Sequence, residues 1–279
     1  MDSKNPRLAP RNFPTAQEEA AVAEVPSRYD GPGSAYRLAF TDTQFLLREE
    51  LRPVRMQLEL LKPELVQQEQ GVEATIVIFG SARIHPDSPY YAQIHDLAKR
   101  IAGEGMDIVT GGGPGLMDAA ASGHQEGNFQ RRAHSIGLPI VLPTAGEHAN
   151  QHLDIKKEFH RFSPRLDAFM RLANCVVIAP GGVGTMLEFM YTWQLIQVHF
   201  RHPIPIILLG DMWPELLAWV RKWQLRPGLL EQKDLDFIHT ARNIDEAMEL
   251  IRASHALFET LGHHPGAHLA RYTHGGPHG

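Results

Sequence analysis

The sequence contains a single cysteine in 279 residues, and it has neither a long apolar run nor an excess of basic residues. One cysteine excludes an intrachain disulfide and a cysteine-rich zinc or iron–sulfur site. Apolar runs such as Ile204–Gly210 are far shorter than the roughly 20 residues that span a membrane. With 27 Lys+Arg against 32 Asp+Glu, the net charge of −5 argues against broad binding to nucleic acid or to an anionic membrane. The N-terminal MDSKNPRLAPRNFP lacks the apolar segment of a secretory signal, so we expect a cytoplasmic protein.

Composition divides the chain into an ordered middle and two weakly patterned ends. Residues 1–40 are rich in Pro, Ala, Arg and Glu without a sustained period, and we expect a mobile arm there. Residues 255–279 hold six of the 16 histidines among Gly and Pro, which predicts a loose tail. The overall 43% apolar and 21% charged residues are typical of a globular protein. We therefore expect the catalytic or binding domain within 71–254.

Residues 41–70 have a pattern of their own. Their leucines recur roughly at helical spacing, which predicts an N-terminal helical extension. Pro53 and Pro63 fall inside this segment, so two short helices or a break are expected. Gly71 is placed to end the segment.

From Ala74 onwards, short apolar runs alternate with amphipathic stretches. This alternation predicts an α/β fold with a doubly wound parallel sheet and helices on both faces. Asn243 is expected to cap the last helix, with Glu246 at capping-box distance. The expected strands are 75–79, 106–110, 134–140, 175–179, 204–209 and 237–240, and the expected helices are 90–105, 114–123, 185–198, 213–223 and 243–251.

Two glycine clusters follow expected strands, where a doubly wound sheet binds its ligands. The first is Gly111-Gly112-Gly113-Pro114-Gly115, and the second is Pro180-Gly181-Gly182-Val183-Gly184-Thr185. Glycine lets the backbone approach a ligand closely, and the free N–H groups at a helix start favour an anion. Two such loops in one sheet predict a phosphate site.

Neither cluster matches a common nucleotide motif. Both lack the Lys of G-x-x-x-x-G-K-[ST] and the last glycine of G-x-G-x-x-G, and no G-x-S-x-G elbow is present. A phosphate monoester therefore fits better than a triphosphate or a dinucleotide. Glu188 follows Gly184 by four residues, so we expect its carboxylate near whatever the loop holds. The alternative is a helix-start acid favoured by the dipole.

The segments GGGPGLM (111–117) and PGGVGTMLE (180–188) resemble the Lonely Guy (LOG) family, whose older label is "possible lysine decarboxylase". The resemblance runs from about Ile76 to Trp219. It implies a Rossmann-like fold, a homodimer or higher homo-oligomer, and no cofactor. The implied reaction is hydrolysis of the N-glycosidic bond of nucleoside 5′-monophosphates, such as AMP or a cytokinin riboside monophosphate, to free base and ribose 5-phosphate.

The resemblance also assigns residues. Glu188 matches the catalytic Glu of the family, and Arg165 matches an essential Arg, with Leu166 where the family usually has Lys. A surface ion pair is the alternative for Arg165. For Arg83, the alternative is a structural salt bridge. The substrate-binding positions implied are Gly80, Ser81, Arg83, Gly111, Gly112, Gly113, Gly181, Gly182, Val183, Gly184, Thr185, Glu147 and Asn150, the last two of which are alternatively ordinary loop residues.

The chemistry of these residue types agrees with that reaction. Breaking a ribosyl C–N bond develops oxocarbenium character on the sugar, which a nearby carboxylate can stabilise while it activates water. An arginine is always charged and binds phosphate through two parallel hydrogen bonds. No side chain is an obvious acid for the departing base.

Other functions stay open at this point. Related folds carry molybdenum cofactor, also a phosphate monoester, and Leu166 is compatible with a site repurposed for binding. A pyridoxal phosphate decarboxylase needs a Schiff-base lysine, and no lysine lies in a glycine loop. His148 and His152 are four residues apart after Glu147, but no third ligand is spaced to complete a metal site, so none is expected.

Overall fold

The computed structural model describes residues 14–23, 37–69, 71–72, 75–130, 132–141, 150–199 and 203–261. The chain divides into two compact units, residues 1–62 and 63–279. In the described part, no helix is both long and apolar enough to cross a membrane.

The described residues of the first unit are mostly helical. Within the expected arm, α1 (Ala16–Ala23) forms, and its start is a reciprocal capping box in which Thr15 and Glu18 bond each other's backbone N–H groups. The four-residue α2 (Thr43–Leu46) and a 3₁₀ turn then lead into α3 (Arg52–Glu69). The expected break at Pro63 is wrong, because α3 runs without interruption from Arg52 to Glu69.

The second unit is built on a parallel sheet. Its described residues form a seven-stranded sheet in the order β4-β3-β2-β1-β5-β6-β7, with every neighbouring pair parallel. The chain starts at the centre, runs outwards to β4 and returns to the other side of β1, so the switch point lies between β1 and β5. The strands are β1 (Thr75–Phe79), β2 (Asp107–Thr110), β3 (Ser135–Gly137), β4 (Ile155–Lys156), β5 (Ala173–Ile178), β6 (Ile206–Leu209) and β7 (Ile238–Ala241).

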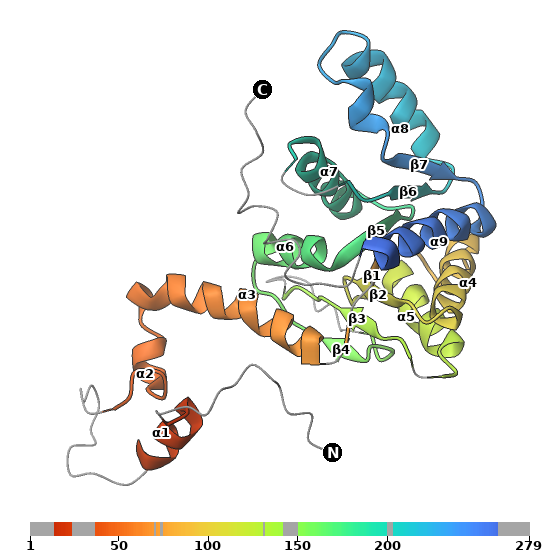
Figure 1. Ribbon diagram of the computed structural model, residues 1–279. Coiled ribbons are helices and arrows are strands. Elements are labelled where there is room, and N and C mark those ends of the chain that lie inside the picture. The colour runs from red at the N-terminus through yellow and green to blue at the C-terminus, as the bar shows by residue number, and fades with distance from the viewer. Residues whose placement is uncertain are drawn as a thin grey trace. The chain divides into compact units, whose positions relative to one another are not determined.

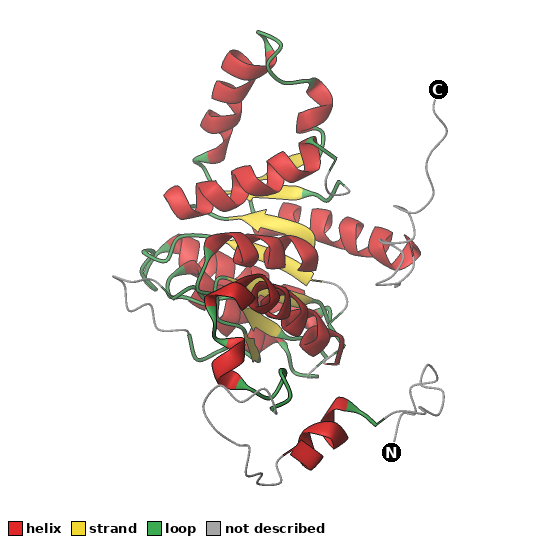
Figure 2. Cartoon of the chain, turned by 90° about the vertical axis from the view of Figure 1, so that its left-hand side faces the viewer, coloured by secondary structure: helices red, strands yellow, loops and turns green. Residues whose placement is uncertain are grey.

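Helices cover both faces of this sheet, as expected. Figure 1 shows α4, α5 and α9 on one side and α6 and α7 on the other, and Figure 2 shows the strands between the helices. The helices are α4 (Pro89–Gly103), α5 (Leu116–Gly127), α6 (Phe162–Leu172), α7 (Val183–Gln197), α8 (Trp213–Val220), which continues as a π-helical turn, and α9 (Ile244–Leu261).

Each strand sends alternate side chains into two separate cores. In β1, Ile76 and Ile78 pack in the core under α4, α5 and α9, while Val77 and Phe79 pack with α6, α7 and α8. Both faces are apolar, so the strand is a continuous apolar run. The amphipathic spacing read from the sequence is confirmed for α4, whose buried residues are Ile94, Leu97, Ala98, Ile101 and Ala102.

Three boundaries differ from expectation. The strand expected at 134–140 is only Ser135–Gly137, because Ile140 leaves the sheet and forms an isolated bridge with Phe159. The two-residue β4 has no apolar run to predict it. Helix α9 extends to Leu261, into the segment expected as a tail, and 262–279 lie outside the described residues.

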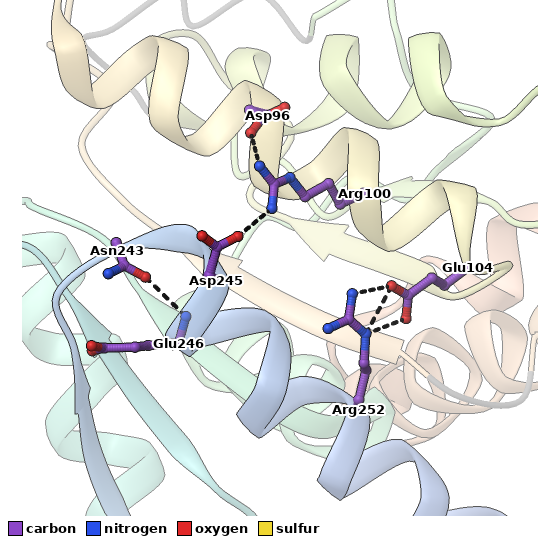
Figure 3. A network of polar contacts seen from close by, with 7 residues as sticks. All are labelled: Asp96, Arg100, Glu104, Asn243, Asp245, Glu246 and Arg252. Atoms are coloured by element: carbon purple, nitrogen blue, oxygen red, sulfur yellow. Dashed lines mark hydrogen bonds and ion pairs between the residues drawn. The ribbon is translucent and has the colours of Figure 1, made fainter.

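Helix α9 is joined to α4 by surface ion pairs (Figure 3). Arg100 contacts Asp96 at 3.1 Å and Asp245 at 2.6 Å, and Arg252 contacts Glu104 at 2.6 Å. Because these groups are exposed, each pair contributes less than about 1 kcal/mol. Asn243 caps α9 as predicted by accepting from the Glu246 N–H at 2.9 Å. The capping box is not reciprocal, since the Glu246 carboxylate accepts from the Arg242 N–H instead.

Candidate functional site

Three loops meet where β1, β2 and β5 end at the carboxyl edge of the sheet. Ser81, in the loop after β1, joins the two glycine clusters. Its N–H donates to the Pro180 carbonyl at 3.1 Å, and its own carbonyl accepts from the Leu116 N–H at 3.0 Å. The clusters follow β2 and β5, the two strands that flank β1, and these bonds to Ser81 bring them together at the switch point of the sheet.

The first glycine cluster is buried and closely packed. A Cβ on Gly111 would lie 2.5 Å from Arg165 Nη2 and 2.6 Å from Met117 Sδ. A Cβ on Gly115, which has φ +70°, would collide with the Ser81 carbonyl. Glycines in this cluster thus allow the loop to lie directly against Arg165 and the loop after β1. Close packing accounts for them without a ligand, a role that the sequence analysis did not weigh.

Asn150 holds the same cluster in place. Its N–H donates to the Gly112 carbonyl at 2.9 Å, and its side-chain amide donates to the Gly113 carbonyl at 3.2 Å. Its side-chain oxygen accepts from the His152 N–H at 3.2 Å. Asn150 is therefore next to the site, as expected, with its polar side-chain atoms committed to the backbone around it.

The second glycine cluster is open. A Cβ on Gly182 or Gly184 would meet no atom within 4 Å, and Val183 is 88% exposed. Gly182 precedes α7 and has no side chain to cap it, so the N–H groups of the first turn are left for another acceptor. Gly181 is required for a different reason, since a Cβ there would collide with the buried Thr185 side chain. This loop, rather than the first, has the free space an anion needs.

Glu188 and Arg165 face each other beside these loops. Glu188 lies in the second turn of α7 and Arg165 in the first turn of α6, two helices that pack side by side (Figure 1). Arg165 Nη1 is 3.4 Å from Glu188 Oε1, and the two side chains are only 9% and 13% exposed. A surface ion pair for Arg165 disagrees with this burial.

Arg165 makes further contacts that fix its position. Its Nε donates to the Leu138 carbonyl at 2.6 Å, just past the end of β3. Its guanidinium carbon lies 5.0 Å from the centre of the Phe169 ring, one turn along α6. One buried cation thus connects β3, the first glycine cluster and Glu188.

The buried position changes the chemistry of Glu188. Burial raises its pKa to about 7, although the charge of Arg165 acts in the opposite direction. Near neutral pH the carboxyl group is therefore present in both protonated and ionised forms. Such a group can both accept and donate a proton at physiological pH.

The remaining predicted residues lie in different surroundings. Arg83 is exposed, its N–H donates to Ser81 Oγ at 3.1 Å, and its side chain forms no salt bridge with another described residue. Leu166 is buried, with 7% of its surface exposed. Glu147, like His148, lies outside the described residues. His152 Nδ1 lies 2.6 Å from Gln125 Oε1, and no cluster of metal ligands occurs among the residues that the structure describes.

One feature of the site was missed at the level of sequence. The Tyr191 hydroxyl donates to Asp167 Oδ1 at 2.5 Å, a second cross-connection between α7 and α6. Burial raises the pKa of Tyr191 to about 12, so the hydroxyl stays protonated. Asp167 lies two residues after Arg165, and Tyr191 lies three after Glu188. The three-residue spacing of Glu188 and Tyr191 predicts that both lie on one face of a helix. It does not predict their partners on α6, Arg165 and Asp167.

The comparisons with known proteins show what this domain is similar to. A family model described as "Possible lysine decarboxylase" matches residues 117–251. A relative from Oryza sativa subsp. japonica, named "Probable cytokinin riboside 5′-monophosphate phosphoribohydrolase LOGL3", is 26% identical over 65% of this chain and 84% of its own. The resemblance to the LOG family is confirmed.

A second relative and a solved structure extend the comparison. The Escherichia coli (strain K12) protein named "Pyrimidine/purine nucleotide 5′-monophosphate nucleosidase" is 29% identical over 48% of this chain and 30% of its own length. The chain therefore spans less than a third of that relative. A solved molybdenum cofactor carrier protein from Chlamydomonas reinhardtii superposes with a TM-score of 0.50 at 22% identity, over 66% of this chain and 99% of its own. At that identity the likeness shows the fold alone, and it confirms the expected Rossmann-like architecture.

Proposed function

We propose that this protein hydrolyses the N-glycosidic bond of nucleoside 5′-monophosphates, with AMP or a cytokinin riboside monophosphate as substrate. The observation that carries the proposal is the buried Glu188–Arg165 pair, 3.4 Å apart, one turn beyond an open glycine loop at a helix start. The names of the rice and E. coli relatives support the same substrate class.

The 5′-phosphate is assigned to the second glycine cluster. The N–H groups of the first turn of the 15-residue α7 and the helix dipole favour an anion there. Gly182, Val183 and Gly184 leave space for it, whereas Gly181 and Thr185 shape the loop beneath. The first cluster, with Gly80 and Ser81, forms the adjoining wall, and the exposed Arg83 is placed to contact the nucleotide.

Glu188 is assigned to the ribose. In the reaction the bond between C1′ and the base nitrogen breaks, water supplies the hydroxyl that C1′ gains, and the departing base gains a proton. The ionised Glu188 stabilises positive charge on the sugar and accepts a proton from the attacking water. With a pKa of about 7, the same carboxyl can return that proton towards the base. This removes the need for a separate acid, for which the sequence offered no candidate.

Arg165 acts on Glu188. Its guanidinium is largely buried and bonded to the Leu138 carbonyl, so it orients the carboxylate and limits the rise in its pKa. Roles of Glu147 and Asn150 in flanking the substrate belong to the same proposal, as do the absence of a cofactor, a cytoplasmic location and a homodimer or higher homo-oligomer.

The test is to incubate the purified protein with AMP, CMP, GMP, UMP and IMP and to measure free base by chromatography. Release of base that is lost in Glu188→Gln and retained in Glu215→Gln, an exposed control in α8, is the expected result. A folded wild-type protein that releases no base from any nucleotide would contradict the proposal. A co-purified chromophore absorbing in the near ultraviolet would then favour cofactor carriage.

A further inference from the structure

Met117 ends the segment GGGPGLM (111–117) and lies in the first turn of α5. Its side chain is half-buried. A Cβ on Gly111 would lie 2.6 Å from Met117 Sδ and 2.5 Å from Arg165 Nη2, so both atoms border one small space that a glycine leaves open. The Met117 thioether therefore lies beside the Arg165 guanidinium, with Sδ at most about 5 Å from Nη2.

The guanidinium of Arg165 contacts different groups on different sides. Its Nε donates to the Leu138 carbonyl at 2.6 Å, and its central carbon lies 5.0 Å from the centre of the Phe169 ring. Its Nη1 faces Glu188 Oε1 at 3.4 Å. Because Nη1 and Nη2 are bonded to the same carbon, Met117 borders the end of the guanidinium that faces Glu188.

The contact between Arg165 and Glu188 is too long to fix its own geometry. Short charge-assisted hydrogen bonds between nitrogen and a carboxylate oxygen measure about 2.7–2.9 Å. The two atoms here are 3.4 Å apart. A strong acceptor standing closer to the guanidinium would therefore compete with Glu188 for its hydrogens. The chemical nature of the side chain beside Nη2 then decides how the cation faces the carboxylate.

We propose that Met117 is a positioning residue that keeps the Arg165 guanidinium turned towards Glu188. A thioether is a weak acceptor, so it fills the space beside Nη2 without competing with the carboxylate for hydrogens. Its unbranched, polarizable chain adapts to an irregular gap. Gly111 leaves the room that this arrangement needs, so the first glycine cluster acts on the reaction through Arg165. That role is separate from the phosphate, which is assigned to the second cluster.

Two substitutions separate the packing of Met117 from its weak polarity, in a kinetic test that rests on the proposed function. Met117→Leu keeps an apolar side chain of similar volume, and its rate is expected to stay within about threefold of wild type. Met117→Gln has nearly the shape of methionine but brings an amide oxygen, a strong acceptor, beside Nη2. For adenine release from AMP, kcat is then expected to fall at least about tenfold while KM changes less than about twofold. Met212→Gln, at a 40% exposed position before α8, is the matched control and is expected to change neither.

A titration of the Glu188 carboxyl tests the same inference without any activity. Burial raises the pKa of Glu188, and the charge of Arg165 opposes that rise. The neighbouring Asp167 accepts from the Tyr191 hydroxyl. Met117→Gln is expected to raise the pKa of Glu188 by about half a unit or more, because the cation turns away, whereas Met117→Leu leaves it within about 0.2 units. The carbon-13 shift of glutamate Cδ in labelled protein reports this pKa, with Glu188→Gln to assign the signal.

The outcomes separate this inference from the proposed function. A Met117→Gln protein with wild-type kcat and a wild-type pKa of Glu188 would overturn the inference. Equal losses in Met117→Leu and Met117→Gln would also overturn it, because they indicate packing alone, and so would a change confined to KM, which indicates substrate binding. If the wild type releases no base but Met117→Gln raises the pKa of Glu188 and Met117→Leu does not, the proposed function fails and the positioning role stands.

Discussion

Arg165 donates to the Leu138 carbonyl at 2.6 Å and, with the same guanidinium, faces the Glu188 carboxylate at 3.4 Å. The end of β3, the first turn of α6 and the second turn of α7 therefore share one buried cation. Arg165 orients the Glu188 carboxylate and offsets part of its negative charge. A substitution of Arg165 is therefore expected to change the pH dependence that Glu188 sets.

The raised pKa of Glu188 should make the free energy of unfolding depend on pH. Its folded-state pKa of about 7 is above the usual carboxyl value of 4.5, so its contribution to stability is complete below pH 4.5 and is lost as the pH rises through 7. Relative to wild type, Glu188→Gln is therefore expected to gain on the order of 2 kcal/mol between pH 5 and pH 8. Denaturant unfolding at both pH values measures this difference, and a difference that does not vary with pH would contradict the assigned pKa.

Replacing Arg165 should change both activity and its pH profile. Arg165→Met removes the charge that lowers the pKa of Glu188, so the profile is expected to move to higher pH. Arg165→Lys keeps a charge but lacks the planar fork that reaches Leu138 and Glu188 together, and we expect about a tenfold or greater loss in kcat with a smaller shift. Initial rates across pH 5–9 separate the two effects. An Arg165→Met profile at the wild-type midpoint would show that the pair is not coupled.

Matched alanine substitutions distinguish the two glycine clusters. Gly111→Ala forces a methyl group against Arg165 and Met117 and is expected to cost about 1–3 kcal/mol in stability. Gly184→Ala meets no atom within 4 Å, so stability should be kept while KM for a nucleoside monophosphate rises. Thermal unfolding and steady-state kinetics provide the two readouts. Equal effects of both substitutions on KM would contradict the assignment of phosphate to the second cluster.

The hydrogen bond between Tyr191 and Asp167 should be structural. Tyr191→Phe removes one hydroxyl that bonds α7 to α6, with an expected cost of about 1 kcal/mol in unfolding free energy. The midpoint of the pH profile should remain that of wild type, because Tyr191 stays protonated throughout the working range. A shifted midpoint in this variant would place Tyr191 in the chemistry instead.

Much of the fold could be predicted because its signals are local. The apolar run of β1 and the spacing of Ile94, Leu97 and Ile101 in α4 each report burial directly. The position of both glycine clusters at one edge of the sheet follows from its parallel topology, whereas their meeting also depends on β2 and β5 lying on either side of β1. The capping box of Thr15 and Glu18 was an equally local signal that was overlooked in a segment judged by composition.

What could not be predicted depends on distant contacts. The hydrogen bond from Arg165 to Leu138 joins residues 27 positions apart in the sequence. The residues next to Arg165 in the sequence do not predict that its side chain is buried. The packing of Gly111 against that guanidinium is likewise visible only in three dimensions, which is why the first cluster was read as a ligand loop. Strand β4 is recognised solely by its pairing with β3.

The most direct measurement compares adenine release from AMP and from adenosine by the wild-type protein and by Glu188→Gln. We predict release from AMP, much slower release from adenosine because the phosphate anchors the substrate, and loss of release in the variant while its fold is retained. Wild-type rates in a folded Glu188→Gln protein, or equal rates for AMP and adenosine, would contradict the account.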